Sequence, residues 1–188
     1  MVITGPSGAG KGTLIGKLVR RMPKLEVAVS ATTRERRPGE VDGRDYWFLS
    51  DQEFARRVDA GDFLEHVRYV SGHRYGTLRS ELDRIRSEGR LPVLELETEG
   101  ALRVRREVPA SLSIFIDAPS FAELERRLRE RATESAGEIG ERLSVARRQR
   151  EQATRFDHVV VNDDLARAVE EVAGIVRHEL GAAATIPS

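Results

Sequence analysis

The chain has 188 residues, no cysteine, and 31 basic against 31 acidic side chains, which gives a formal net charge of zero. This length suits one domain with a substantial core, and the lack of cysteine excludes disulfides, thiol catalysis and cysteine-bound zinc. A balanced charge argues against a general nucleic-acid or membrane-surface binder, because both show a basic excess. No apolar run approaches the roughly 20 residues of a membrane span, so we expect a cytoplasmic protein.

The chain opens with a predicted strand at Val2–Ile3, a glycine-rich turn and a helix from Lys11 to Met22. The turn matches G-x-x-x-x-G-K-[ST] up to Lys11, but Gly12 occupies the hydroxyl position and Thr13 follows it. Glycines let backbone N–H groups converge on an anion, and the helix N-terminus and Lys11 add positive charge. The sequence therefore predicts a nucleoside triphosphate site at Gly5, Pro6, Ser7, Gly8, Ala9, Gly10, Lys11, Gly12 and Thr13.

The next elements are short and irregularly connected. The pattern predicts strands at Glu26–Val29, Tyr46–Leu49 and Phe63–Val70, a helix from the capping box at Ser50 to about Ala60, and a helix from Thr77 to Glu88. Residues 30–45 are polar and rich in turn formers, which indicates a loop. Because these strands lack full-length crossover helices, we expect a small mixed lobe inserted after the second strand.

The second half alternates regularly. We predict strands at 91–96, 111–116 and 158–161, and helices at 120–131, 141–154 and 163–180. This alternation is typical of an α/β protein with a parallel sheet flanked by helices. Ligands in such sheets bind beyond the C-terminal ends of the strands, so the glycine-rich turn, Ser30 and Glu97 should share one cleft.

Three arginines lie within four positions at Arg34, Arg36 and Arg37, with hydroxyl residues before them and Tyr46 after them. Guanidinium groups bind phosphate oxygens in pairs, and a tyrosine donates a further hydrogen bond. These residue types suit a phosphate monoester. A solvated charged loop is the alternative that the segment alone leaves open.

The segment from Ser30 to Phe48 resembles the guanylate kinase pattern S-x-T-T-R-x-P-R-x-G-E-x-x-G-x-x-Y-x-F, with Arg36 in place of the proline. Further segments resemble the same family, in order, along nearly the whole chain; they are Phe63–Glu65, Tyr75–Thr77, Glu95–Ala101, Arg127, Arg131–Glu134, Arg142–Leu143 and Val161–Asp164. Two positions depart from the family pattern, because Glu99 replaces a glutamine and Ala132 replaces a glycine.

The resemblance implies a P-loop kinase fold: a parallel sheet flanked by helices, with an inserted mixed α/β lobe and a helical lid. It implies one domain over residues 1–188, with its core at 1–29, 80–119 and 149–180. The GMP-binding lobe would be residues 30–79, the lid 120–148, and residues 181–188 a flexible tail.

The resemblance also implies a guanylate kinase reaction, in which Mg²⁺-dependent in-line transfer from ATP to GMP or dGMP gives ADP and GDP or dGDP. It implies no nucleic acid, no membrane and no obligatory protein partner. The implied catalytic residues are Lys11, Arg34, Arg131 and Arg142. ATP would be bound by the glycine-rich turn together with Arg127, Arg131, Asn162 and Asp163, with Thr13 beside Mg²⁺ directly or through water. GMP would be bound by Ser30, Arg34, Arg37, Glu40, Tyr46, Glu65, Tyr75, Thr77 and Glu97.

The implied acceptor residues suit guanine. Guanine presents N1–H and N2–H₂ donors beside the O6 acceptor, so the Glu65 and Glu97 carboxylates match its donors and the Ser30 and Thr77 hydroxyls match O6. Adenine would leave a buried carboxylate unpaired, a mismatch that can discriminate by roughly 10⁴-fold.

Two other functions compete with this hypothesis. A non-catalytic guanylate-kinase-like module could bind phosphopeptides through the same arginines, although Lys11 and the lid arginines argue against it. A P-loop kinase for another small acceptor is the second, and Glu65, Thr77 and Glu97 argue against that one. The spacing of Glu123 and Arg127 also allows a plain helical ion pair for this lid arginine.

Overall fold

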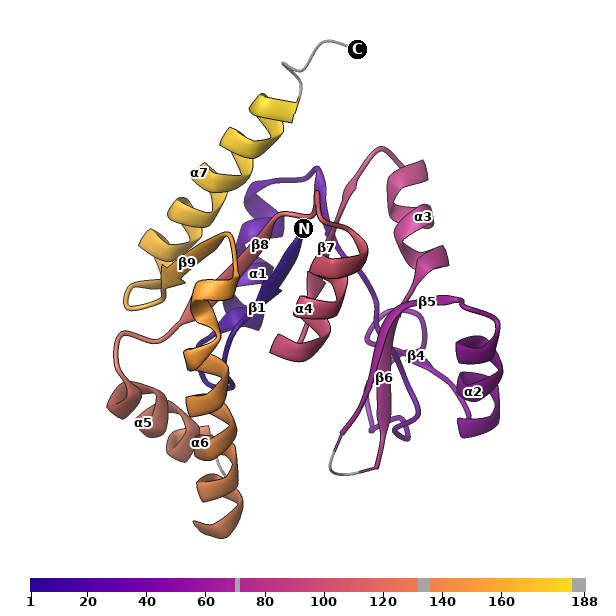
Figure 1. The fold of residues 1–188 in the computed structure, drawn as a ribbon, viewed down its shortest axis with the longest axis horizontal. Coiled ribbons are helices and arrows are strands. Elements are labelled where there is room, and N and C mark those ends of the chain that lie inside the picture. The colour runs from indigo at the N-terminus through magenta and orange to yellow at the C-terminus, as the bar shows by residue number, and fades with distance from the viewer. Residues whose placement is uncertain (70–71, 132–135, 184–188) are drawn as a thin grey trace.

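The computed structural model describes residues 1–69, 72–131 and 136–183. Its main sheet has five parallel strands in the order β2-β7-β1-β8-β9, which confirms the predicted sheet (Figure 1). The strands are β1 (Val2–Thr4), β2 (Leu25–Val27), β7 (Leu91–Glu95), β8 (Ser113–Asp117) and β9 (His158–Val161). The glycine-rich turn leaves the central strand, β1, so its ligand site lies at the middle of the sheet edge.

Helices cover both faces of this sheet. Successive strand residues point to opposite faces, so Ile3 packs in one core cluster and Val2 in another. The Ile3 cluster includes residues of α1 (Lys11–Arg21) and α7 (Leu165–Ala183). The Val2 cluster includes residues of α3 (Arg79–Ser87) and α4 (Thr98–Glu107). The strand ends that carry the site are thus fixed by packing on two sides.

The inserted lobe (residues 30–79) has its own mixed sheet in the order β4-β3-β6-β5. Its elements are β3 (Ala31–Thr32), β4 (Trp47–Phe48), α2 (Asp51–Asp59), β5 (Phe63–Arg68) and β6 (Arg74–Leu78). Phe54 of α2 stacks on Phe63 of β5 with ring centroids 4.4 Å apart, which gives the lobe a small separate core.

We call α5 (Phe121–Arg131) and α6 (Ala136–Glu151) the lid helices, which extends the lid expected at residues 120–148 to the end of α6. A 3₁₀ turn at Ala153–Arg155 leads from α6 to β9. Figure 1 shows these helices and the inserted lobe on opposite sides of the core. The predicted Arg131–Glu134 motif lies largely outside the described residues. Within the described part of the chain, no helix is long and apolar enough to span a membrane.

Several element boundaries differ from the expectations. Helix α4 was not predicted, and its start carries no capping signal because Glu97, at its N-cap, makes no side-chain cap hydrogen bond. Thr77 lies in strand β6 rather than at a helix start, and the helix begins at Arg79. Helix α6 begins at Ala136, earlier than predicted, and α7 extends to Ala183, into the predicted tail. Thr77 belongs to β6 because it pairs with Glu65 of β5.

Candidate active site

The glycine-rich turn closes tightly between β1 and α1. Gly5 has φ 141° and Gly10 has φ 85°, a region that favours glycine. A Cβ at Gly5 would lie 2.0 Å from the Ile116 carbonyl oxygen, and one at Gly10 would lie 2.5 Å from the Asn162 Nδ2. The turn therefore needs glycine at both positions, for backbone conformation and for space.

Lys11 bends back over the turn. Its Nζ donates to the carbonyl oxygens of Gly5 at 2.7 Å and Pro6 at 3.1 Å. Burial lowers the pKa of the Lys11 ammonium, while the Glu97 and Glu95 carboxylates act in the opposite direction. A cation is thus held at the helix N-terminus, beside the backbone N–H groups of the turn.

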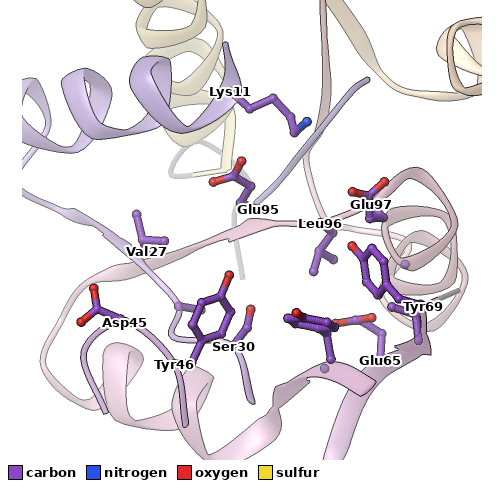
Figure 2. A pocket seen from close by; sticks show the side chains of 15 residues that line it. Lys11, Val27, Ser30, Asp45, Tyr46, Glu65, Tyr69, Glu95, Leu96 and Glu97 are labelled. Atoms are coloured by element: carbon purple, nitrogen blue, oxygen red, sulfur yellow. The ribbon is translucent and has the colours of Figure 1, made fainter. Parts of the chain in front are cut away.

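A cavity of about 430 Å³ lies between the C-terminal edge of the main sheet and the inserted lobe. Figure 2 shows Lys11 at one side of it and Glu65 at the other. Of the predicted site residues, the cavity wall brings together Lys11, Ser30, Tyr46, Glu65, Tyr75 and Glu97. These residues come from the core and from the lobe, so both are needed to form the site.

Glu65 is a buried carboxylate, 5% exposed, on the lobe side of this cavity. Burial raises its pKa, and the Thr77 hydroxyl opposes that rise by donating to the Glu65 Oε1 at 2.9 Å. A Cβ at Gly100 would lie 2.9 Å from the Glu65 Oε2, so the glycine leaves room for the carboxylate. Such an acceptor is suited to a ligand that presents N–H donors.

The arginine cluster lies next to the cavity rather than in its wall. Arg34 donates from Nη2 to the Glu40 Oε1 at 2.7 Å, and its guanidinium lies 5.3 Å from the Tyr46 ring centroid. The Arg34 guanidinium lowers the pKa of Glu40, which also accepts the Arg37 backbone N–H at 2.8 Å. Arg34 also hydrogen-bonds with Tyr75, a cavity residue. The Arg37 side chain is exposed.

A second hollow of about 320 Å³ lies on the lid side of the glycine-rich turn. It brings together six of the predicted ATP-binding residues: Gly8, Gly10, Thr13, Arg127, Asn162 and Asp163. Asn162 donates from Nδ2 to the Ala9 carbonyl oxygen at 2.8 Å and so ties β9 to the turn. Arg127 donates to Glu123 at 2.7 Å and to the Asn162 carbonyl oxygen at 3.1 Å.

Two lid arginines remain from the predicted set. Arg142 of α6 donates from Nη2 to the Ser7 Oγ at 2.7 Å, which connects the lid directly to the glycine-rich turn. Arg131 is the last residue of α5. Helix α6 thus reaches the glycine-rich turn through an arginine.

The residues of the cavity wall that were not among the predicted site residues include Tyr69, Glu95 and Gly100. Glu95 carried a signal, because residues two apart on a strand point the same way and Glu97 was already a candidate. The Glu95 residue is exposed, yet protein surrounds its carboxylate, and this desolvation raises its pKa while Lys11 opposes the rise. Tyr69 had no such signal, because it reaches the cavity through contact with Tyr75 of another strand.

The comparisons with known proteins agree with this geometry. The guanylate kinase family model matches residues 1–179. A guanylate kinase of Rubrobacter xylanophilus is 48% identical over 177 residues, covering 94% of this chain and 92% of that protein. One of Symbiobacterium thermophilum is 42% identical over 179 residues, covering 95% of this chain and 84% of that protein.

A solved structure agrees as well. The crystal structure of guanylate kinase from Anaplasma phagocytophilum matches with a TM-score of 0.75 at 31% sequence identity, covering 95% of this chain and 84% of that chain. The P-loop, the carboxylate cavity and these similarities lead to one conclusion: the chain belongs to the guanylate kinase family.

Proposed function

We propose that this chain transfers the γ-phosphoryl group of ATP to GMP or dGMP in the cleft described above, giving ADP and GDP or dGDP. The observation that carries the proposal is a single cavity with Lys11 of the P-loop at one side and the buried Glu65 carboxylate at the other. Direct transfer needs no protein nucleophile, only alignment of the two nucleotides and stabilisation of charge. Since both nucleotides are cytoplasmic metabolites, we expect the enzyme to act in the cytoplasm.

Guanine recognition would depend on Glu65. The carboxylate would accept N1–H and N2–H₂ of the base, and Thr77 would hold it in place, because that hydroxyl already donates to Glu65. Ser30, which lines the same cavity, is then the better hydroxyl for O6. Glu97, on the core side of the cavity, would be the second acceptor.

The GMP phosphate would be bound by Arg34, Arg37, Tyr46 and Tyr75. Glu40 holds Arg34 against the Tyr46 ring, so the guanidinium is oriented before GMP binds. The Arg37 side chain is exposed, and we expect it to turn toward the phosphate on binding. Two guanidinium groups would match the charge of a monoester dianion.

ATP would bind along the P-loop and in the hollow beside it. Its phosphates would displace the Gly5 and Pro6 carbonyls as partners of Lys11. Arg127, Arg131 and Arg142 would add charge from the lid, and Asn162 and Asp163 would lie near adenine. We propose that closing of the lid and the inserted lobe excludes water, which protects ATP from hydrolysis.

Magnesium fits the residues present. Mg²⁺ in kinases is held by phosphates, waters and one or two carboxylates rather than by a protein cage, and the described residues contain no group of three acidic, histidine or cysteine ligands. A Cβ at Gly12 would lie 3.8 Å from the Glu95 Oε2, so a carboxylate faces the position where the motif usually has a hydroxyl. Glu95 would therefore hold Mg²⁺, with Thr13 the candidate hydroxyl, directly or through water. The bound ion would neutralise charge on the transferring phosphoryl group.

A substrate panel tests the proposal. The purified protein should form ADP from MgATP with GMP or dGMP, and should be at least about 10³-fold less efficient, in kcat/KM, with AMP, CMP or UMP. No GMP-dependent ADP formation would favour a non-catalytic binding module. Comparable turnover of another monophosphate would favour a kinase for a different acceptor.

A further inference from the structure

Glu97 occupies an unusual position for a helix N-cap residue. It follows β7 and precedes α4, with φ −65° and ψ 154°, yet its carboxylate makes no cap hydrogen bond to its own helix. The side chain faces the cavity instead (Figure 2). Its two oxygens are therefore available to partners from other parts of the chain.

One partner comes from the lid. Gln149 of α6 donates from Nε2 to the Glu97 Oε2 at 2.6 Å, and the glutamine is only 8% exposed. Arg142, Ala146 and Gln149 share one face of α6 by helical spacing, and Ala146 between them is fully buried. The same helix face thus contacts Ser7 of the P-loop through Arg142 and Glu97 of the acceptor cavity through Gln149.

The other partner comes from the inserted lobe. The Tyr69 hydroxyl, just after β5, hydrogen-bonds with the Glu97 carboxylate and is directed toward it (Figure 2). Burial and then the Glu97 charge raise the pKa of Tyr69, so the phenol keeps its proton and acts as the donor. The Tyr69 ring packs edge-on against Tyr75, with centroids 4.8 Å apart, which fixes the direction of the hydroxyl.

We propose that Tyr69 and Gln149 are positioning residues that hold the Glu97 carboxylate from the lobe side and the lid side, so that acceptor recognition is linked to the placement of both. The inference rests on the proposed guanylate kinase function. Neither residue needs to touch the reacting atoms. A carboxylate bound by one donor from each side keeps a defined orientation and presents its remaining lone pairs to the acceptor nucleotide.

The test uses Tyr69→Phe, which removes one hydroxyl and keeps the ring, and Gln149→Leu, which removes the amide. We expect Tyr69→Phe to raise the KM for GMP about 3- to 10-fold and Gln149→Leu about 5- to 30-fold, with the KM for ATP and kcat within about threefold of wild type. Gln152→Leu, just beyond the end of α6, is the matched control and should leave the KM for GMP unchanged. Melting temperatures show whether each variant folds. If Gln149→Leu does not fold, the kinetics of Tyr69→Phe alone test the inference.

A Glu97→Ala background separates positioning from a merely structural role. With the carboxylate gone, Tyr69→Phe and Gln149→Leu should change kcat/KM for GMP less than about twofold, because their effects act through Glu97. The inference would be overturned if either substitution lowered kcat/KM for GMP as much in the Glu97→Ala background as in the wild type. Equal increases in the KM for ATP and the KM for GMP would overturn it too. If the wild type does not phosphorylate GMP at all, the proposed function fails instead; an active wild type with unaffected variants contradicts only this inference.

Discussion

The Lys11 ammonium donates to the Gly5 carbonyl oxygen at 2.7 Å, so the charged group that we assign to the ATP phosphates is already folded onto its own loop. Under the proposed function, phosphate oxygens of ATP would replace the loop carbonyls as partners of Lys11. Lys11 would then act at the transferring phosphoryl group rather than at the GMP base.

Replacement of Lys11 should therefore separate turnover from acceptor binding. We expect Lys11→Ala to lower kcat by about 10²- to 10³-fold or more, because a preorganised charge on the transferring phosphoryl group is lost. GMP affinity, measured by calorimetry, should change less than about threefold. Lys17→Ala, exposed on the same helix, is the matched control and should retain full activity. A parallel loss of GMP affinity in Lys11→Ala would contradict the assignment.

Glu65→Gln tests guanine recognition. The amide keeps the size of the side chain but presents an N–H₂ group toward the base donors, and an unpaired buried donor costs about 1–3 kcal/mol. The KM for GMP should rise roughly ten- to hundredfold, with the KM for ATP unchanged. Steady-state kinetics with each substrate varied in turn would measure both. An unchanged KM for GMP would mean that Glu65 does not bind the base.

The raised pKa of Glu65 gives a pH dependence with a defined sign. As pH falls through this raised value, Glu65 takes up a proton and loses its ability to accept from guanine, so the KM for GMP should rise. In the same interval the native state binds more protons than the unfolded state, so stability should fall as pH rises through it. Glu65→Gln should lose both dependences and melt at or above the wild-type temperature at neutral pH. If Glu65→Gln keeps the wild-type pH dependence of the KM for GMP and of stability, then a group other than Glu65 titrates in this interval.

Gly100→Ala should disturb the same carboxylate without altering its chemistry. The added methyl would lie 2.9 Å from the Glu65 Oε2, too close for normal contact, so Glu65 must shift. We expect the KM for GMP to rise at least about fivefold, while the KM for ATP stays constant. Gly174→Ala in α7 has no atom within 4 Å of its added methyl and serves as the control. Equal kinetics for the two variants would show that Glu65 has room to move.

Asn162→Ala should weaken the donor site. Asn162 donates to the Ala9 carbonyl oxygen at 2.8 Å, and its loss leaves a buried acceptor unpaired, which costs about 1–3 kcal/mol of stability. The KM for ATP should rise more than the KM for GMP. Ser50→Ala is a control of similar instability, because it removes the N-cap of α2 in the inserted lobe, where Ser50 accepts the Glu53 backbone N–H. If both variants raise the KM for ATP equally, the effect is instability rather than loop geometry.

Much of the fold could be predicted because its elements have local sequence patterns. The five apolar strands of the main sheet and the P-loop have strong sequence signals, and the Ser50 cap does accept the Glu53 backbone N–H at 3.1 Å. Helix α4 lacked such a signal, since it begins at an uncapped carboxylate and is held by packing of Leu102 and Val104 on the sheet. Packing between segments distant in sequence determines where such a helix forms, and a local sequence pattern does not indicate that packing.

The site residues also fall into those that local motifs predicted and those that they did not. Lys11 and Glu65 could be found because each lies in a motif with a chemical reason for its residue type. Tyr69 and Gln149 could not, because their contact with Glu97 brings together residues from three separate segments. Arg34 and Arg37 were predicted as a pair, yet the structure gives Arg34 firm partners and leaves the Arg37 side chain exposed.

The three tyrosines of the chain, Tyr46, Tyr69 and Tyr75, all lie in the wall of one cavity, and the only tryptophan, Trp47, belongs to the inserted lobe. The tyrosines therefore surround this cavity, and the tryptophan packs against the core of the lobe that forms one side of it. Ultraviolet difference spectra and Trp47 emission should report events there and remain nearly silent to changes at α7. Since the chain has no cysteine, a single engineered thiol on the lid would accept a dye for energy transfer without competing sites.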